Sequence, residues 1–309
     1  MKTPVVFMGS PEFAVPCLQA LIDIADVRLV VTQPDKPKGR GRALAPPPVK
    51  EAALAAGLRV LQPAKVKNND ELLAELRAAR PEVIVVVAYG RILPKTILEL
   101  PPRGCINVHA SILPKYRGAA PIQWAIARGE TETGVTIMQI DEGMDTGAML
   151  LVEKIPISAD DNAATLSAKL ARLGAQALVR ALPGVIDGTL PPTPQDNAHA
   201  THAPLLTKEH GRVDFSKPAR EVRDWIRAMD PWPGAETTLA GEPLKLFSPK
   251  LISGGGAAGT VMGADRDGLL IACGHGAIGV AELQLPGKKR MPAKALLAGH
   301  SIPLGTRLG

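Results

Sequence analysis

The run VIVVVA at residues 83–88 most constrains how this chain can fold. A segment that is apolar at every position, rather than at every second one, is typical of a central parallel strand that is covered on both faces. Strands and helices are predicted to alternate ahead of it, with strands at 4–8, 27–31 and 59–61 and helices at 49–56 and 70–79. This alternation predicts βαβαβ winding, and therefore an α/β fold with a doubly wound, mostly parallel sheet.

A second, smaller domain is expected beyond residue 207. The chain has 309 residues, 46% of them hydrophobic, which is long for one core and comfortable for two. Residues 190–207 hold three prolines in their first five positions and little periodicity, so they are interpreted as a linker between domains at 1–189 and 208–309. After a helix near 219–229, several short runs divided by Gly and Pro predict a small β-barrel.

Charge and cysteine content narrow the class of protein. The net charge of +6 and pI near 9.3 fit a polyanionic partner, and equally an ordinary basic protein. Cys17, Cys105 and Cys273 are far apart and form no C-x-x-C pair, which argues against a disulfide framework or a zinc ribbon. No apolar run is long enough to span a bilayer. We expect a soluble protein of the reducing cytosol with no membrane partner.

The stretch GCINVHASILPKYRG, residues 104–118, is the strongest candidate for a site. Ile106 and Val108 alternate with Asn107 and His109, so in a strand the amide and the imidazole stand on the face opposite the aliphatic pair. A lone histidine after a buried strand is more often structural. Here Asn107 precedes it and Ser111 follows it at the carboxyl end of a strand, where α/β proteins bind ligands, and this favours a functional site.

The turn DEGMDTG, residues 141–147, is the second chemical element. Its carboxylates, Asp141, Glu142 and Asp145, are compatible with a solvated turn, a divalent metal site or a partner for His109. The regular ligand spacing of a metal site is missing. We therefore favour Asp145 as the carboxylate that orients the His109 ring and favours its charged form.

A basic segment at residues 33–50 follows the second predicted strand. Its basic residues, interleaved with Gly and Pro and opposed only by Asp35, are Lys36, Lys38, Arg40, Arg42 and Lys50. The Gly and Pro content predicts an irregular loop, and long loops in compact domains are uncommon unless functional. Contact with a phosphate backbone is favoured over incidental surface charge, with Lys288, Lys289 and Arg290 as second candidates.

Residues 84–121, IVVVAYGRILPKTILELPPRGCINVHASILPKYRGAAP, together with 141–147, closely resemble the folate-dependent formyltransferases. The segments KPKGRGRALAPPPVK and GKKRMPAKALLAGH, at 36–50 and 287–300, are similar to the members of that family that act on methionyl-tRNA. The resemblance implies a Rossmann-like first domain, an OB-like second domain, 10-formyltetrahydrofolate as co-substrate and no metal.

The resemblance also implies roles for individual residues. Asn107, His109 and Asp145 correspond to the catalytic trio of the family. The folate is contacted by the run Ser111, Ile112, Leu113 and Pro114. The acceptor end of methionyl-tRNA is contacted by the loop residues Lys36, Lys38, Arg40 and Arg42.

Chemistry supports this interpretation, and alternatives remain. Formyl transfer to an amine passes through an oxyanion, which an Asn amide and a His N–H can stabilise. An amino-sugar formyltransferase would lack the basic loop, and the hydrolase part of a formyltetrahydrofolate dehydrogenase would continue into a long dehydrogenase domain. A non-catalytic RNA-binding protein on an α/β scaffold is a third alternative. We expect a monomer.

Overall fold

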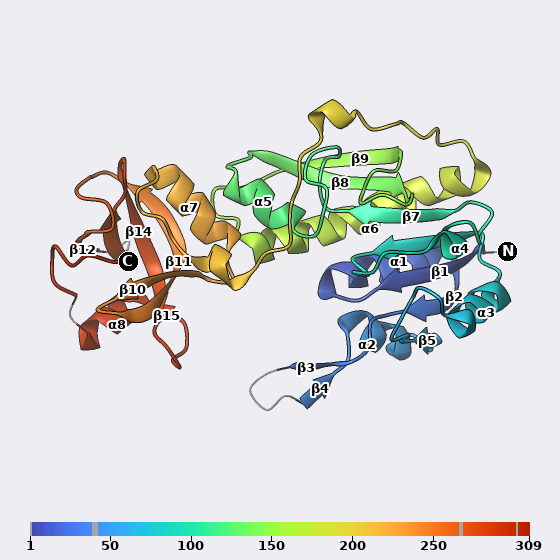
Figure 1. Cartoon of the computed structure of the whole chain (residues 1–309), viewed down its shortest axis with the longest axis horizontal. Helices are drawn as coiled ribbons and strands as arrows, with labels where there is room; N and C mark the ends of the chain where they lie inside the picture. Colours follow the sequence, from blue (N-terminus) through green and yellow to red (C-terminus); the bar gives the residue numbers. More distant parts are fainter. Residues whose placement is uncertain (1, 39–42, 266–267, 301) are drawn as a thin grey trace. The chain divides into compact units, whose positions relative to one another are not determined.

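The computed structural model describes residues 2–38, 43–265, 268–300 and 302–309 (Figure 1). The chain forms two compact units. The first contains Met1–Ala119, Thr133–Ile155 and Ser167–Ala203, and the second contains Ala120–Glu132, Pro156–Leu166 and Pro204–Gly309. Two short segments that precede Pro204 along the chain, Ala120–Glu132 and Pro156–Leu166, therefore belong to the second unit.

The first unit is built on a seven-stranded sheet with the order β5-β2-β1-β6-β7-β8-β9. Its strands are β1 (Pro4–Gly9), β2 (Asp26–Val31), β5 (Val60–Leu61), β6 (Val83–Val87), β7 (Cys105–His109), β8 (Glu132–Gln139) and β9 (Met149–Pro156). The first five in this order pair in parallel, and β8 runs antiparallel to β7. This order is Rossmann-like, and every residue of β6 is buried, so the predicted doubly wound sheet is confirmed.

Helices connect these strands, as the alternation predicted. They are α1 (Val15–Ile24), α2 (Pro48–Ala55), α3 (Asp70–Ala79), α4 (Lys95–Leu98) and α6 (Ala163–Asp187), with a short 3-10 turn η1 at Glu12–Ala14. The α3 helix shows how the local sequence sets a boundary. Asn69 caps its first turn by accepting a hydrogen bond from the Leu72 N–H at 2.9 Å. Its buried Leu72 and Leu76 pack into the same core as Val6 and Ile84.

The basic segment contains more structure than its composition indicated. Strands β3 (Lys36–Lys38) and β4 (Ala43–Ala45) pair as a separate antiparallel hairpin. Pro37 is tolerated because each strand of a two-stranded sheet has one unpaired edge, so its missing N–H removes no obligatory bond. The expected irregular loop is therefore replaced over these six residues by a hairpin, and residues 39–42 lie outside the described part of the chain.

The second unit is a small β domain with helices, as predicted. Its sheet has the order β10-β11-β14-β13-β12, with β15 also paired to β14, and these strands pair antiparallel. The elements are α5 (Pro121–Ala127), η3 (Lys208–Gly211), α7 (Ala219–Ala228), β10 (Ala235–Leu239), β11 (Glu242–Ile252), β12 (Val261–Asp265), β13 (Gly268–Ala272), β14 (Ala277–Gln284), β15 (Met291–Pro292) and α8 (Ala293–Gly299). The α7 helix packs against β11 and α5.

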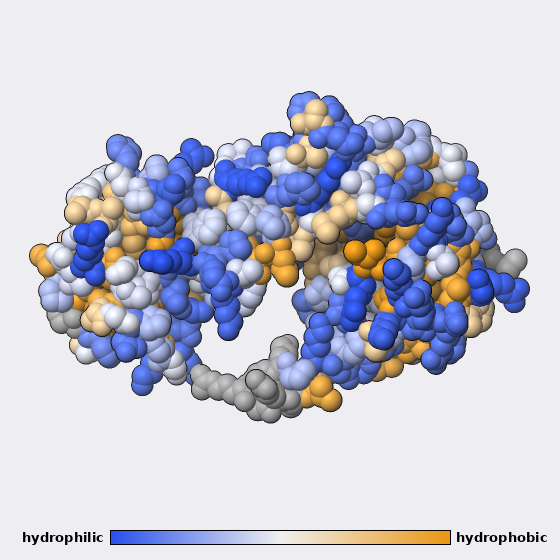
Figure 2. Space-filling model, viewed as in Figure 1, coloured by the Kyte–Doolittle hydropathy of each residue, from blue (hydrophilic) through white to orange (hydrophobic). Residues whose placement is uncertain are grey.

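Hydrophilic residues cover most of the face shown in Figure 2, with smaller hydrophobic areas between them. Within the described residues, no helix combines the length and the apolar character needed to cross a membrane.

Candidate functional site

Strand β7 places the candidate amide and imidazole at the carboxyl end of the parallel part of the sheet. Ile106 and Val108 are fully or almost fully buried, whereas the Asn107 side chain between them is partly accessible. His109 pairs with Thr136 of β8 and is only 6% exposed. The predicted alternation of the two faces is therefore present in the structure. Among the described residues, none forms a hydrogen bond with the Asn107 amide, which leaves its donor available.

Both ring nitrogens of His109 face oxygen atoms. Its Nε2 lies 3.0 Å from the Tyr116 carbonyl oxygen, a distance at which the N–H donates a hydrogen bond. Its Nδ1 lies 3.6 Å from Asp145 Oδ2. That second distance is too long for a good hydrogen bond but short enough for a strong electrostatic interaction in a buried place. Each ring nitrogen of His109 therefore faces an oxygen acceptor.

Asp145 is held in an uncommon conformation beside His109. Its backbone has a φ of 55°, in the left-handed region that few residues other than glycine adopt. Its Oδ2 accepts a hydrogen bond from the Gly118 N–H at 2.8 Å. Gly118 has a φ of 123°, and a Cβ there would lie 2.7 Å from the Ala203 carbonyl oxygen. Glycine is therefore required at position 118 for the approach that brings its N–H to Asp145.

The three carboxylates of the acidic turn serve different partners. Asp141 Oδ1 closes its own turn by accepting from the Gly143 N–H at 3.1 Å and the Thr146 hydroxyl at 2.7 Å. Glu142 is exposed and lies 3.9 Å from Lys95 Nζ. Only Asp145 is directed to His109. Within the described residues, no group of three His, Cys, Asp or Glu side chains has the arrangement of a metal site.

The four residues expected to contact folate differ in how accessible they are. Ser111 is fully buried, and its hydroxyl donates to the Lys115 carbonyl at 2.6 Å. Leu113 is also buried, and its N–H donates to the Thr136 hydroxyl at 3.2 Å. Ile112 and Pro114 are partly accessible. The buried pair therefore fixes the turn, and the other two present the surface that a ligand can touch.

The basic residues of the hairpin are only partly described. Lys36 is exposed, and its Nζ donates to Gln33 Oε1 at 2.7 Å. The backbone of Lys38 lies in β3, and Arg40 and Arg42 lie outside the described residues. Lys50 is not a free charge, because its Nζ lies 2.9 Å from both carboxylate oxygens of Asp35. Hydrogen bonds from Gln62 and Lys50 lower the pKa of Asp35 from its usual value.

Family models match both units. The model for formyl transferase matches residues 1–182, and the model for the C-terminal domain of formyl transferase matches residues 205–301. The chain belongs to the formyl transferase family. The family resemblance of the β7 stretch and the acidic turn is thereby confirmed.

Similar proteins of this family cover nearly the whole chain. Methionyl-tRNA formyltransferase of Trichlorobacter lovleyi is 50% identical over 305 residues, which is 98% of this chain and 96% of the relative. The protein of the same name from Acidobacterium capsulatum is 53% identical over 307 residues, which is 98% of this chain and 99% of that protein.

Two solved structures share the fold at low identity. WlaRD, a sugar 3N-formyl transferase solved with dTDP and 5-N-formyl-THF, is 19% identical with a TM-score of 0.68, covering 94% of this chain and 100% of WlaRD. HypX from Aquifex aeolicus, solved with tetrahydrofolic acid, is 18% identical with a TM-score of 0.64 over 99% of this chain. This chain spans 51% of HypX. At this identity the likeness concerns the fold alone.

Two residues of this formyl transferase near the site were missed in the sequence. Arg117 is 7% exposed, and its guanidinium donates to the side chain of Gln195. Gln195 in turn donates to the backbone of the acidic turn. Gln195 lies in the stretch interpreted as a linker, where no periodicity or motif marks it. The only signal was the basic Arg117 directly after the buried strand and its turn.

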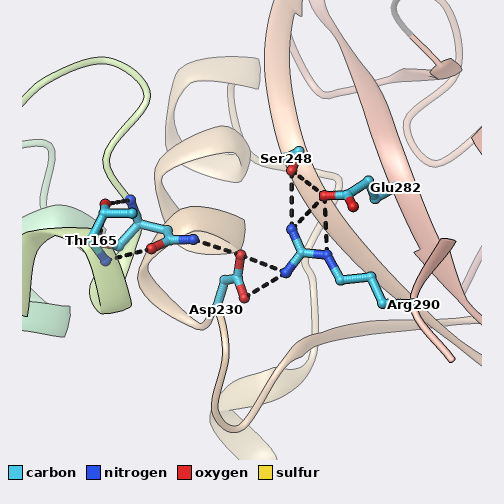
Figure 3. A network of polar contacts seen from close by, with 6 residues as sticks. Thr165, Asp230, Ser248, Glu282 and Arg290 are labelled. Atoms are coloured by element: carbon cyan, nitrogen blue, oxygen red, sulfur yellow. Dashed lines mark hydrogen bonds and ion pairs between the residues drawn. The ribbon is translucent and has the colours of Figure 1, made fainter. Parts of the chain in front are cut away.

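In the second unit, Arg290 forms a network of polar contacts that Figure 3 shows from close by. Its guanidinium lies 3.0 Å from Asp230 Oδ1 and 2.6 Å from Glu282 Oε2, and it also donates to Ser248 Oγ at 3.1 Å. It lies over the Phe247 ring, 4.2 Å from the centroid. Arg290 is therefore committed to internal partners, unlike an arginine that is free to bind phosphate.

Proposed function

We propose that this chain transfers the formyl group of 10-formyltetrahydrofolate to the α-amino group of methionyl-tRNA, which yields N-formylmethionyl-tRNA for translation initiation. The observation that carries this proposal is identity of about half of all residues, over nearly the full length, with proteins named methionyl-tRNA formyltransferase. The meeting of His109 and Asp145 beside Asn107 supplies chemistry that suits the reaction.

The reaction balances without a covalent enzyme intermediate. The amine nitrogen attacks the formyl carbon, and the bond from that carbon to the folate nitrogen breaks. The proton lost by the amine ends on the folate nitrogen. An α-amine with a reference pKa of about 7.7–8.0 is partly neutral at physiological pH, so a weak base suffices. The main demand on the protein is stabilisation of the oxyanion in between.

We assign Asn107 to donating a hydrogen bond to the formyl oxygen, because its amide is partly accessible and uncommitted among the described residues. We assign His109 to oxyanion stabilisation and proton transfer. Its Nε2–H donates to Tyr116 O here, so donating to substrate requires exchange of that bond. The Asp145 carboxylate beside Nδ1 favours the positive charge that such donation needs.

The remaining parts of the proposal concern partners and location. Folate contact is assigned to the run 111–114, with Ile112 and Pro114 as its accessible members. Contact with the acceptor end of the tRNA is assigned to Lys36, Lys38, Arg40 and Arg42. We assign the two domains to residues 1–189 and 208–309, with 190–207 as the connecting segment, which belongs to the first compact unit as far as Ala203. We place the enzyme in the cytosol, because its three cysteines are free and buried, as a reducing compartment allows. We also propose that it is a monomer, which light scattering would test.

A formylation assay tests the function. Purified protein is given methionyl-tRNA or a free amino sugar, each with and without 10-formyltetrahydrofolate. The expected result is consumption of the formyl-folate only when methionyl-tRNA is present. Formylation of the amino sugar instead, or binding of tRNA without any transfer, would reject the proposal.

A further inference from the structure

The Gln195 side chain joins two parts of the site by four hydrogen bonds. Its Oε1 accepts from Arg117 Nε at 3.0 Å and from Arg117 Nη2 at 2.7 Å. Its Nε2 donates to the carbonyl oxygens of Asp145 and Gly147, each at 2.8 Å. Both hydrogens of the amide are thus used, and its oxygen receives two. The guanidinium fixes which end of the amide faces the acidic turn, because only the oxygen can accept from it.

Arg117 is itself fixed by the segment 193–203, here called the return segment. Its Nη2 also donates to Asn197 Oδ1 at 2.8 Å. Its backbone N–H donates to Thr201 O at 2.8 Å, and its carbonyl accepts from the Ala203 N–H at 2.7 Å. The guanidinium is therefore bonded to two neutral amide oxygens, and the Arg117 main chain is bonded to Thr201 and Ala203. Because the Arg117 guanidinium is planar and fixed in this way, its two donors hold the Gln195 amide in one orientation.

The acidic turn needs such a restraint. Aspartate is one of the few residues besides glycine that adopt the left-handed region, and the conformation persists where its surroundings hold it. Asp145 has this conformation, and Gln195 binds its carbonyl and that of Gly147. At Gly147, a Cβ would overlap the carbonyl oxygen of Gln139, so this side of the turn has no room to move toward β8. Gln195 restrains it from the other side.

We propose that Gln195, oriented by Arg117, is a positioning residue that holds the Asp145 carboxylate beside His109 for formyl transfer. This inference rests on the proposed function for its kinetic consequence. Gln195 acts through the backbone of the acidic turn and is assigned no contact with substrate. Its loss lets the Asp145 carboxylate drift from His109 Nδ1, which weakens stabilisation of the charged ring in the transition state.

Two substitutions and one control test this role kinetically. Gln195→Met removes all four bonds, whereas Gln195→Glu keeps the acceptor for Arg117 but replaces the donor with an oxygen that repels the two carbonyls. Both should lower kcat by about 10- to 100-fold, the effect of misplacing a group by about 1 Å. KM for both substrates should stay within about twofold. Gln19→Met, on the exposed face of α1, is the matched control and should keep wild-type kinetics.

A double-mutant cycle shows whether Gln195 acts through Asp145. In an Asp145→Asn background, Gln195→Met should lower kcat by less than about twofold, because coupled residues are not additive. Full additivity of the two losses would overturn the inference. A rise in KM with kcat unchanged would also overturn it, because that result would place Gln195 in substrate binding.

A measurement independent of activity separates this inference from the proposed function. The Gly118 N–H donates to Asp145 Oδ2, so its hydrogen exchange reports where that carboxylate lies. In protein with isotope-labelled glycine, Gln195→Met and Gln195→Glu should each raise the Gly118 exchange rate by about tenfold or more, and Gln19→Met should not. Unchanged exchange in both variants overturns the positioning role. If the wild type is inactive on methionyl-tRNA but the Gln195 variants still raise the Gly118 exchange rate, only the proposed function is rejected.

Discussion

His109 with Asp145, and Arg290 with Asp230, are both pairs of a basic side chain and a carboxylate, one in each unit. Arg290 Nη1 lies 3.0 Å from Asp230 Oδ1, and the same guanidinium is bonded to Glu282 and Ser248. His109 Nδ1 lies 3.6 Å from Asp145 Oδ2. One pair has the geometry of direct hydrogen bonds, and the other lies just beyond it.

This difference in distance separates a pair that stabilises the fold from a pair that can take part in catalysis. Every partner of Arg290 is internal and close, so the network fixes the positions of β11, β14 and the turn that follows α7. Beside His109, in contrast, the Asn107 amide has no partner among the described residues, and the Asp145 carboxylate lies beyond the distance of a good hydrogen bond to Nδ1. A site that stabilises developing charge needs hydrogen-bond donors that are not already in use, whereas a structural network does not.

Removing either proposed oxyanion donor, Asn107 or His109, should give the largest effect. Asn107→Ala and His109→Ala should each lower kcat by about 100- to 1,000-fold, the usual cost of losing an oxyanion donor. His109→Ala should also lower the unfolding free energy by about 0.5–1.5 kcal/mol, because it removes the hydrogen bond from the ring to the Tyr116 carbonyl. Steady-state kinetics and urea unfolding measure the two effects. Near-wild-type turnover in either variant contradicts the assigned chemistry.

The hairpin charges should give the next largest effect, and they sharpen the contrast with Arg290. Replacing Lys36, Lys38, Arg40 and Arg42 with Ala removes charges that can release counterions from RNA. Binding of methionyl-tRNA should weaken, and its slope against log salt should flatten by up to about four units. Lys36→Gln alone is the graded control and should change the slope by about one unit at most.

An unchanged salt profile in the four-Ala variant would remove the hairpin from the RNA interface. Lys288 and Lys289, which are exposed, would then be the next residues to test. Arg290 would not, since its charge is offset by Asp230 and Glu282.

Breaking the Arg290 pair should change stability rather than chemistry. Arg290→Met leaves the Asp230 side chain, which is only 5% exposed, with the Asn162 amide as its remaining partner among the described residues. An uncompensated buried charge should lower the unfolding free energy of the second unit by about 3 kcal/mol. Lys289→Met, a neighbouring exposed site, should leave it within about 0.5 kcal/mol. Urea unfolding followed by tryptophan fluorescence measures this, and equal midpoints for the two variants would contradict the structural role.

The fold was predictable where local pattern decides it. The apolar run of β6 and the alternation around Asn107 and His109 depend on periodicity alone, and both are present in the structure. The Gly- and Pro-rich segment was harder. Backbone pairing of Lys36–Lys38 with Ala43–Ala45 depends on few side-chain contacts and therefore leaves little trace in composition.

The contact between His109 and Asp145 was predictable from the sequence, whereas the hydrogen bonds that hold the acidic turn were not. His109 lies at the end of one strand and Asp145 in the turn after the next strand along the chain, so a contact between imidazole and carboxylate could be expected from the sequence. Gln195 acts on the acidic turn from 50 positions away along the chain, through a backbone carbonyl. A side chain that recognises main chain needs no particular residue type as its partner. No pattern in a single sequence therefore marks it.

Glu282 offers the smallest and most specific test of the second pair, through pH. Hydrogen bonds from Arg290 and then Ser248 lower the pKa of Glu282 from its ordinary value of 4.5. Because the folded state lowers this pKa, the stabilisation is present in full above the unfolded value and is lost as pH falls through the folded one. Glu282→Gln should therefore be less stable than wild type at pH 7, and the gap should narrow below about pH 4.5. Glu242→Gln, at the exposed start of β11, is the matched control and should show no such narrowing. A gap for Glu282→Gln that stays constant from pH 7 downward would mean that shape rather than charge holds Glu282 to Arg290.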